Sequence, residues 1–534
     1  MRPRANQGRR FFRSGPVIAA AVVAMALAGC GSSNSGGTSA ATTPHGGGSL
    51  TVLEGSSFAG AWPGLDPATD TDGAANQSYM DAIFGELFEL GQGGKIIPDL
   101  ATGYSYANGD KTTVITLRQG VKFSDGTPFN AAAVAANWNR DLASSCTCKP
   151  IFLSKPVITT PGPYTVDLTL SYVNAPFIDG LQDDIFNWIA SPAALRSMGE
   201  TAFALKPVGA GPFTVVSDTP SSALVLKANP HYWQKGLPYL KTLTFKPVLD
   251  DETALKDLES GAGQAYEGMS TPQLAKSFQA HFTTTVEPST SPYDIQLNTM
   301  TAPFNNIRAR QAIYYATDTP LLDQKLFGNA YPPTQSFTAS AGLYYEPKVP
   351  GYLTYNLAKA KMLVKQVGGI NISLDTITSP VAQTLDEGLA EEWEAAGMKV
   401  TLHNYDLTGL IAVFQSGKWQ SFLQTAGAWD PEAGVGVAFR FASTSPFTGV
   451  KDPHLDSLID AASGTIVSSQ RQTFNDQINA YIAQKAYGPF LFPIAGYNIA
   501  GHGVAGPGLT TPIPSQAVLP EILWQYAYND NNAG

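Results

Sequence analysis

The sequence predicts an α/β fold divided into two or three domains. The first observation is length, because 534 residues at about 150 residues per domain leave enough chain for sizeable hydrophobic cores. The second is composition, since 43% of the residues are hydrophobic and 10% are aromatic, as in ordinary globular proteins. The third is a helical pattern followed by a strand pattern, which occurs twice and indicates an α/β domain around 300–490.

Strand patterns dominate the first half of the chain. In "YTVDLTL" the apolar residues Val166, Leu168 and Leu170 alternate with polar ones, as a half-buried strand requires. Other segments of this kind lie at 49–55, 112–118, 223–227 and 240–248.

Two helix–strand units follow. In "VAQTLDEGLAEEWEAAG" the residues Val381, Leu385, Leu389 and Trp393 share one helical face, and Gly397 is positioned to end the helix. The strand "MKVTLHNYD" comes next. "LAKAKMLVKQVGG", residues 357–369, repeats the helix-then-glycine pattern before the strand "ISLDTIT".

The N-terminus has the pattern of a secretory signal peptide. A segment with five arginines precedes an apolar run, Val17–Ala28, that is shorter than the about 20 residues of a membrane span. "LAGC" resembles a bacterial lipobox, which implies that residues 1–29 are removed and that Cys30 is lipidated and anchors the chain to the outer face of the cell membrane. A cleaved signal with an incidental cysteine is the alternative. "RRFF" resembles a twin-arginine signal, so the Sec and twin-arginine export routes both stay open.

A flexible tether and a strong negative charge are expected of the mature chain. Residues 30–49 are rich in Gly, Ser and Thr and would span roughly 25 Å. Without residues 1–29 the chain has 28 basic and 43 acidic residues, a net charge of −15. This charge argues against nucleic acid and anionic lipid as partners.

No catalytic or metal-binding pattern is evident. The six histidines are scattered, and the sequence lacks a His-Glu-x-x-His motif, a nucleophile elbow and a Walker loop. "GAGPF", residues 209–213, lacks the third glycine of a dinucleotide fingerprint. We therefore expect a protein that is not an enzyme and has no cofactor. Cys146 and Cys148 could form a bridge or stay as free thiols.

Three local patterns indicate structure. "FSDGTPF" predicts a turn at Asp125 and Gly126, with Pro128 in the first turn of the next helix. Asp251 is expected in the first turn or at the cap of its helix. Arg308 and Arg310 are expected at the surface or paired with other elements, with binding of a ligand anion as the alternative.

Four blocks resemble one known family in its order along the chain. They are "LRQGVKFSDGTP" at 117–128, "NPHYW" at 229–233, "NTMTAPFNNIRARQAIYYATD" at 298–318 and "LAKAKMLVKQVGG" at 357–369. The family comprises the solute-binding proteins of peptide-type ABC importers (family 5: oligopeptide, dipeptide and nickel binders). Two features depart from its pattern: Gln264 and Ala265 stand where the family usually has an acid, and the segment from Trp429 is shortened.

This resemblance implies a two-lobed periplasmic-binding-protein-like fold of the class II type, with an extra subdomain inserted in the first lobe. The expected boundaries are 50–292 plus 491–534 for lobe I, about 95–205 for the subdomain and 293–490 for lobe II. Ligand would bind between the lobes, which close around it. The implied partners are short peptides or similar small solutes and ABC permease subunits, with no nucleic acid, and the expected state is a monomer.

Candidate ligand-binding residues come from three places. Phe58 and Trp62 lie in a glycine-rich loop after the first strand, and Tyr344 and Tyr345 lie in "SAGLYYEP". The third place is "AWDPEAG", with Trp429 and Asp430.

Asp430 allows two interpretations. The resemblance implies an acid near this position that holds the amino terminus of a peptide. Alternatively, Asp430–Pro431 begins a turn, and Arg440 pairs with the carboxylate inside the protein.

Two other functions also stay open: a secreted cell-wall hydrolase, since catalytic carboxylates have no local signature, and a ligand-sensing lipoprotein without a permease.

Overall fold

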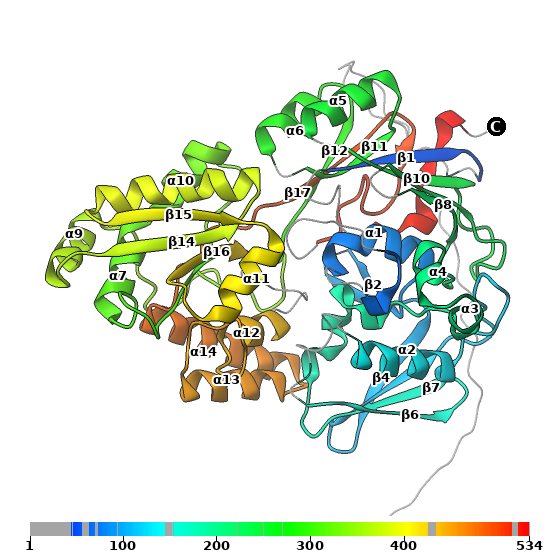
Figure 1. The fold of residues 1–534 in the computed structure, drawn as a ribbon, viewed down its shortest axis with the longest axis horizontal. Coiled ribbons are helices and arrows are strands. Elements are labelled where there is room, and N and C mark those ends of the chain that lie inside the picture. The colour runs from blue at the N-terminus through cyan, green and yellow to red at the C-terminus, as the bar shows by residue number, and fades with distance from the viewer. Residues whose placement is uncertain are drawn as a thin grey trace, which may run out of the picture. The chain divides into compact units, whose positions relative to one another are not determined.

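Two large sheets organise the chain into two lobes (Figure 1). The computed structural model describes residues 44, 46–55, 64–69, 73–92, 94–144, 152, 154–219, 222–248, 250–269, 271–425, 434–514 and 522–532. These residues belong to the unit Pro44–Gly534.

The first lobe is built on a seven-stranded sheet in which β1 is central and runs parallel to both of its neighbours. Leu50 and Val52 pack on one face against α1, and Leu53 packs on the other face against α5 and α6. The strand is therefore apolar on both sides, as a central strand must be. In spatial order the strands are β12 (Thr283–Glu287), β17 (Gly496–Ala500), β11 (Ala265–Met269), β1 (Ser49–Glu54), β10 (Thr242–Pro247), β9 (Ala223–Ala228) and β8 (Phe213–Thr219). The helices are α1 (Gly73–Phe84), α5 (Asp251–Ser260) and α6 (Pro272–Phe278).

An antiparallel four-stranded sheet with α2 adjoins this lobe and shares its hydrophobic core. Trp138 of α2 is fully buried, and its indole nitrogen donates to the carbonyl of Phe186 at 2.8 Å. The strands are β4 (Ala101–Ala107), β5 (Thr112–Leu117), β7 (Thr165–Thr169) and β6 (Val157–Gly162), and the helices nearby are α2 (Ala131–Ala143), α3 (Pro192–Met198) and α4 (Glu200–Leu205). Smaller pieces are the pairs β2 (Phe88–Gly91) with β3 (Lys95–Pro98) and β18 (Val504–Ala505) with β19 (Tyr528–Asn529), and the short helix η3 (Ala175–Phe177).

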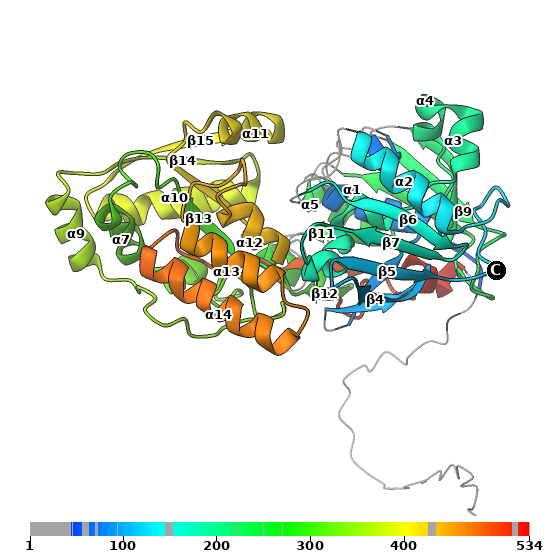
Figure 2. The ribbon, with the colours of Figure 1, turned by 90° about the horizontal axis from the view of Figure 1, so that it is seen from below.

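The second lobe has a four-stranded sheet and two groups of helices. Its strands are β13 (Tyr293–Leu297), β16 (Ser421–Thr425), β14 (Asn371–Ile377) and β15 (Lys399–Tyr405). Its helices are α7 (Ile307–Ala316), α8 (Thr319–Leu322), α9 (Leu357–Gln366), α10 (Pro380–Ala395), α11 (Leu407–Ser416), α12 (Gly434–Phe441), α13 (Pro453–Ser463) and α14 (Ser468–Lys485). The helices α13 and α14 lie side by side and form a separate small core with α12 (Figure 2).

Two chain segments connect the lobes, one between β12 and β13 and one between α14 and β17. They are bonded to each other, since the backbone nitrogen of Tyr293 donates to Phe492 at 3.0 Å and that of Leu491 donates to Tyr293 at 2.8 Å. Paired connections of this kind suit a hinge.

The helix–strand units predicted in the second half are confirmed. Ser379 caps α10 by accepting a hydrogen bond from the backbone of Ala382 at 3.2 Å, and Gly397 follows the helix with φ of 90°. Strand β15 begins two residues later and pairs in parallel with β14. The five strands predicted in the first half are also present, as β1, β5, β7, β9 and β10.

The predicted turn at Asp125 is confirmed. Its carboxylate accepts hydrogen bonds from the backbone nitrogen of Thr127 at 2.8 Å and from the Thr127 hydroxyl at 2.6 Å, and Gly126 has φ of 84°. Asp125 therefore shapes this turn.

The expectation that Pro128 opens the next helix is wrong. Asn130 caps α2 by accepting from the backbone of Ala133 at 3.0 Å, so the helix begins at Ala131. Pro128 instead pairs with Lys122 in an isolated bridge.

The structural roles predicted for Arg310 and Asp251 are confirmed. Arg310 is 7% exposed and donates to the carbonyls of Phe304 at 2.7 Å and Lys485 at 2.8 Å. Asp251 lies in the first turn of α5, whose cap is Asp250.

Candidate functional site

A cavity of about 820 Å³ lies between the two lobes, a volume typical of ligand pockets. One wall comes from the first lobe and includes Phe152, Tyr172 and Pro176, and the other comes from α12, α13 and the segment between them. The second wall carries two acids, Asp456 and Asp460, and no Lys or Arg is among the described lining residues. The cavity therefore offers aromatic surface, hydroxyl groups and negative charge.

The N-terminus of α12 approaches the first lobe closely. A Cβ added to Gly434 would lie 2.7 Å from Cβ of Pro176, nearer than real contacts allow. Gly434 therefore permits the start of α12 to pack against η3. It also follows directly after 426–433, the segment that contains Trp429 and Asp430.

Arg440 anchors α12 to the end of β16. This arginine is 5% exposed, and its Nη2 donates to the carbonyl of Thr425 at 2.6 Å. Gln296 supports the same junction, because its side-chain nitrogen donates to the carbonyl of Arg440 at 3.1 Å and its oxygen accepts from Gln424 at 2.6 Å. Strand β13 thereby contacts both β16 and α12, the two elements that flank residues 426–433.

Asp294 is the acid that faces Arg440 within the described residues. Burial raises the pKa of Asp294 to about 7, and the arginine partly opposes that rise. Burial also lowers the pKa of Arg440 to about 10. Asp430, the partner predicted for Arg440, lies outside the described residues, so that pairing stays a prediction.

Tyr344 packs on the start of α14. It is 9% exposed, and its hydroxyl lies 3.1 Å from Ser468 Oγ and accepts from Nε of Arg471 at 3.1 Å. The neighbouring Tyr345 is half-buried. Neither tyrosine is among the described residues that line the 820 Å³ cavity, and their ligand-binding role stays a prediction.

Several other candidates lie outside the described residues. They are Phe58, Trp62, Trp429 and Asp430, the lipidation candidate Cys30, and the pair Cys146 and Cys148. Their predicted roles are therefore carried forward as proposals.

Three buried glutamates on the seven-stranded sheet of the first lobe were not predicted from the sequence. Glu54 ends β1 directly opposite Glu267 on β11, and Glu287 ends β12; they are 2%, 1% and 0% exposed. Burial raises the pKa of Glu54, and the neighbouring Glu267 raises it further by its charge and a shared hydrogen bond. Burial also raises the pKa of Glu287 to about 8.

The sequence contains a local signal for two of these glutamates, Glu54 and Glu267. Glu54 and Glu267 each end an apolar stretch and precede a glycine, in "VLEG" and "AYEG". Because β1 and β11 are parallel, both acids lie toward the carboxyl edge of the sheet, where α/β proteins commonly bind ligands.

Neither a metal centre nor a membrane span is found in the described part of the chain. No group of three or more His, Cys, Asp or Glu side chains there could hold a metal ion. No helix there combines the length and the apolar character needed to cross a membrane.

The protein family is assigned by a family model that matches more than half of the chain. The model of the bacterial extracellular solute-binding proteins, family 5 Middle, matches residues 95–446. The chain belongs to this family.

Relatives and solved structures agree with this assignment. The glutathione-binding protein GsiB of Salmonella typhi is 32% identical over 311 residues, which are 57% of this chain and 59% of the relative, so the match spans less than two thirds of the relative's length. A dipeptide-binding protein from Pseudoalteromonas sp. SM9913, solved with Met-Leu, has a TM-score of 0.77 at 18% identity over 90% of this chain and 100% of the other. The protein AgaA from A. tumefacien R10, solved with agropinic acid, has a TM-score of 0.74 at 23% identity over 88% and 96%.

These structures have the two-lobed periplasmic-binding-protein fold, which confirms the predicted fold class for this family 5 protein. In this chain the 820 Å³ cavity has walls from both lobes.

Proposed function

We propose that this family 5 protein is the lipid-anchored, extracytoplasmic binding component of an ABC importer. It captures short peptides or related small solutes between its lobes and delivers them to a membrane permease. The observation that carries this proposal is the cavity of about 820 Å³ whose walls come from both lobes of a solute-binding fold.

The substrate class is supported by the relatives. The GsiB proteins are named for glutathione, and the dipeptide-binding protein was solved with Met-Leu. The aromatic and hydroxyl groups of the cavity suit small ligands with both polar and apolar parts.

In the proposed mechanism, ligand binding shifts the equilibrium between an open and a closed form of the protein. Ligand that contacts both lobes favours the closed form over the open form, because only the closed form makes both sets of contacts. Residues Phe58, Trp62, Tyr344, Tyr345, Trp429 and Asp430 are the proposed ligand contacts. Cys30 is the proposed site of the lipid anchor, which keeps the body near its permease.

Calorimetric titration tests this function, first with a mixture of short peptides and then with single peptides. We expect saturable heat and a rise in melting temperature, since ligand that binds only the folded state stabilises it. Absence of both signals with every peptide and related solute would overturn the proposal. Turnover of a peptide or glycan would instead identify a hydrolase.

Substitution Asp430→Asn tests the assignment of the acid that receives the ligand's amino group. We expect at least a tenfold loss of affinity for peptides with a free amino terminus, because the proposed charge pair with the ligand's ammonium is replaced by a neutral contact. The melting temperature of the free protein should not change. Lower stability with unchanged affinity would identify Asp430 as a residue that only forms the turn.

A further inference from the structure

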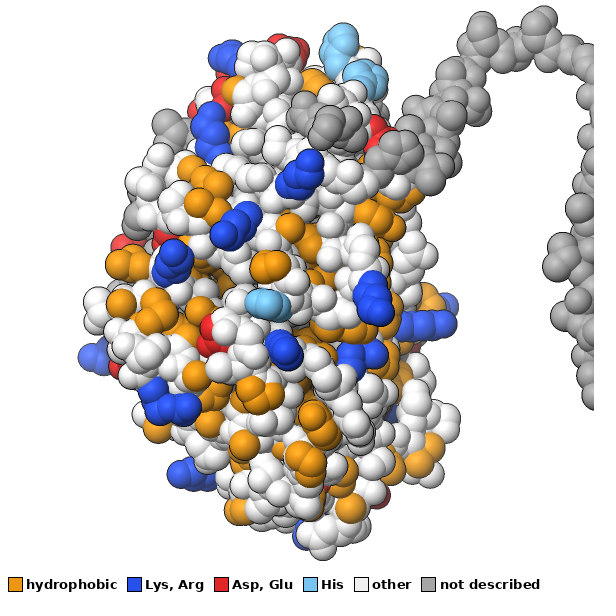
Figure 3. Space-filling model, turned by 90° about the vertical axis from the view of Figure 1, so that its right-hand side faces the viewer, with side chains coloured by type: hydrophobic (Ala, Val, Ile, Leu, Met, Phe, Trp, Pro, Cys, Tyr) orange, Lys and Arg blue, Asp and Glu red, His pale blue; other side chains and the backbone are white. Residues whose placement is uncertain are grey.

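One face of the first lobe is basic although the chain as a whole is acidic. Residues 191–248, which include α3, α4, β8, β9 and β10, contain six Lys and Arg and only two acids. Of these acids, Glu200 already lies 3.4 Å from Arg140. Figure 3 shows this side of the molecule, with Lys and Arg side chains spread over it and Asp and Glu side chains few.

The basic residues come from neighbouring pieces of chain. Lys227 on β9 pairs with Thr242 on β10, and the backbone of Ala228 donates to the carbonyl of Lys241 at 2.9 Å, so the two lysines come from adjoining pieces of chain, one position out of register. Strand β9 continues into the turn that holds Lys235. That turn is fixed to the segment after α4, since the side chain of Asn229 donates to the carbonyl of Gly211 at 2.8 Å.

The same surface extends to the end of α4 and to the turn after β5. Lys206 follows α4, and Lys122 lies next to this region because the backbone of Ser124 donates to Gly209 at 2.9 Å. Arg196 of α3 is the last member of this surface. We call the surface the basic face and define it by six residues: Lys122, Arg196, Lys206, Lys227, Lys235 and Lys241.

Five of the six charges of the basic face, those other than Lys241, are available to a partner. All six side chains are exposed. Within the described residues, no ion pair involves Lys122, Arg196, Lys206, Lys227 or Lys235. Three large apolar side chains are also exposed on α3, α4 and β8, namely Met198 at 36%, Leu205 at 53% and Val216 at 49%.

The described body of the protein begins at the basic face. The backbone nitrogen of Gly47 donates to Tyr239 at 2.7 Å, and Gly48 accepts from the backbone of Lys241 at 3.0 Å. The Lys241 ammonium also lies 3.8 Å from the position of a Cβ on Gly47. The chain that leads back toward Cys30 therefore leaves the body next to these lysines.

We propose that the basic face binds the anionic headgroups of the membrane, an inference that rests on the lipid anchor of the proposed function. About 14 residues separate Cys30 from the body, a length that spans roughly 20 Å when flexible. Such a distance brings the basic face within reach of the lipid surface, where each Lys or Arg increases binding to anionic lipid about fivefold. A lipid chain combined with a basic patch also holds a protein more firmly than either alone.

Binding to anionic lipid departs from the expectation drawn from the net charge. The net charge of −15 argued against anionic lipid, but net charge describes the field far from the protein. At a Debye length of about 8 Å a membrane interacts with the nearest face alone. The acids that dominate the total lie largely elsewhere, since 191–248 contain only two of them.

Flotation with lipid vesicles tests the proposal. The protein is residues 30–534 with Cys30→Ala, which retains the whole unit Pro44–Gly534 and cannot be lipidated. At about 0.1 M ionic strength, where the Debye length is about 10 Å, we expect it to float with vesicles that contain phosphatidylglycerol and not with vesicles of phosphatidylcholine alone. Equal flotation with both kinds of vesicle would overturn the proposal.

A matched pair of triple variants locates the contact. The first carries Lys206→Gln, Lys227→Gln and Lys235→Gln, and we expect it to lose at least tenfold in partition to the anionic vesicles. The control has the same change in charge at exposed lysines elsewhere: Lys276→Gln, Lys361→Gln and Lys399→Gln. Unfolding curves establish that both variants fold. The control should bind like the parent, since its lysines lie away from the basic face, and an equal loss in both variants would contradict a specific face. Flotation of these variants does not depend on which ligand binds between the lobes, so a failure of this proposal can be distinguished from a failure of the proposed function.

Discussion

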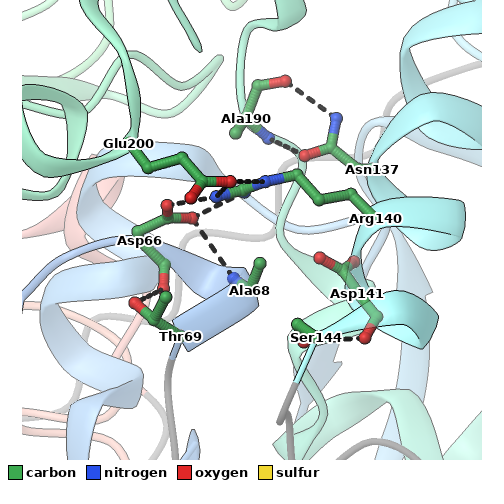
Figure 4. Close-up of polar contacts among 9 residues, drawn as sticks. All are labelled: Asp66, Ala68, Thr69, Asn137, Arg140, Asp141, Ser144, Ala190 and Glu200. Carbon is green, nitrogen blue, oxygen red and sulfur yellow. Dashed lines mark hydrogen bonds and ion pairs between the residues drawn. The ribbon is translucent and has the colours of Figure 1, made fainter.

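At the scale of single residues, one buried carboxylate depends on one arginine. Asp66 is fully buried, and Arg140 of α2 binds it through both terminal nitrogens, one of them at 2.8 Å from Oδ1 (Figure 4). The backbone of Ala68 donates to the same oxygen at 3.2 Å. This pair ties residues 64–69 to α2.

We expect Arg140→Met to lower the free energy of unfolding by about 3–5 kcal/mol, because it leaves an uncompensated charge in the core. Glu200 also lies near Arg140, at 3.4 Å, but it is 74% exposed. Glu200→Gln should therefore cost less than about 0.5 kcal/mol. Urea unfolding of the three proteins measures both values, and similar losses for the two variants would contradict this account.

Glu287 makes the stability depend on pH. Burial raises its pKa in the folded protein to about 8, whereas an unfolded chain titrates near pH 4.3. Between these values the folded state keeps a proton that the unfolded state has lost. The contribution is therefore fully present below about pH 4 and is lost as the pH rises toward 8.

Substitution Glu287→Gln removes this titration. Its side chain still offers an oxygen to the backbone of Ile513, which donates to Glu287 at 2.8 Å. We expect the free energy of unfolding to fall less steeply from pH 5 to pH 8 than in the parent, by roughly 2–4 kcal/mol in total. The exposed Glu259→Gln serves as control and should keep the parent slope. Parallel curves for all three proteins would contradict the assignment.

At the scale of elements, the segment "GAGPF" is a contact between a helix and the strand β8. A Cβ on Gly211 would lie 2.6 Å from the backbone nitrogen of Gly85 and 2.7 Å from the carbonyl carbon of Ile83, at the end of α1. The backbone of Gly211 donates to Ile83 at 3.1 Å. The glycine therefore allows α1 to approach the sheet, a role that explains why no third glycine is needed.

We expect Gly211→Ala to lower the free energy of unfolding by about 2–3 kcal/mol, because α1 must move away from the start of β8. Gly46 provides the control, since a Cβ there would meet nothing within 4 Å. Gly46→Ala should change stability by less than about 0.5 kcal/mol. Thermal and urea unfolding compare the two, and equal effects would contradict a close approach.

Elements with strong local signals could be predicted from the sequence. The four-residue spacing of Leu385, Leu389 and Trp393 specifies the buried face of α10, and Gly397 supplies its end. The start of α2 was missed because proline at a first turn and asparagine at a cap compete as signals. Here the side-chain hydrogen bond of Asn130 decides the boundary.

At the scale of the whole molecule, the candidate site could be predicted only as a class. Four family blocks indicated two lobes with a cleft between them, which the family match and the solved structures bear out. The residues of the described cavity were not predicted, because Pro176 and Ser463 are 287 positions apart and have no shared pattern in the sequence. The basic face could not be predicted from the sequence either, since its residues come from separate segments of an acidic chain.

Blocking the cavity between the lobes should prevent ligand from binding there. Ser463 ends α13 and lines the cavity, whereas Ser457 lies exposed on the same helix and is not among the described lining residues. A tryptophan at 463 would occupy space that ligand needs and would prevent the lobes from approaching. We expect Ser463→Trp to weaken binding of the peptide found by calorimetry at least tenfold, with a change in melting temperature below about 2 °C. Ser457→Trp adds the same side chain outside the cavity and should bind like the parent. Equal affinities for the two variants would place the ligand elsewhere, whereas loss in Ser463→Trp alone would show that the ligand occupies this cavity.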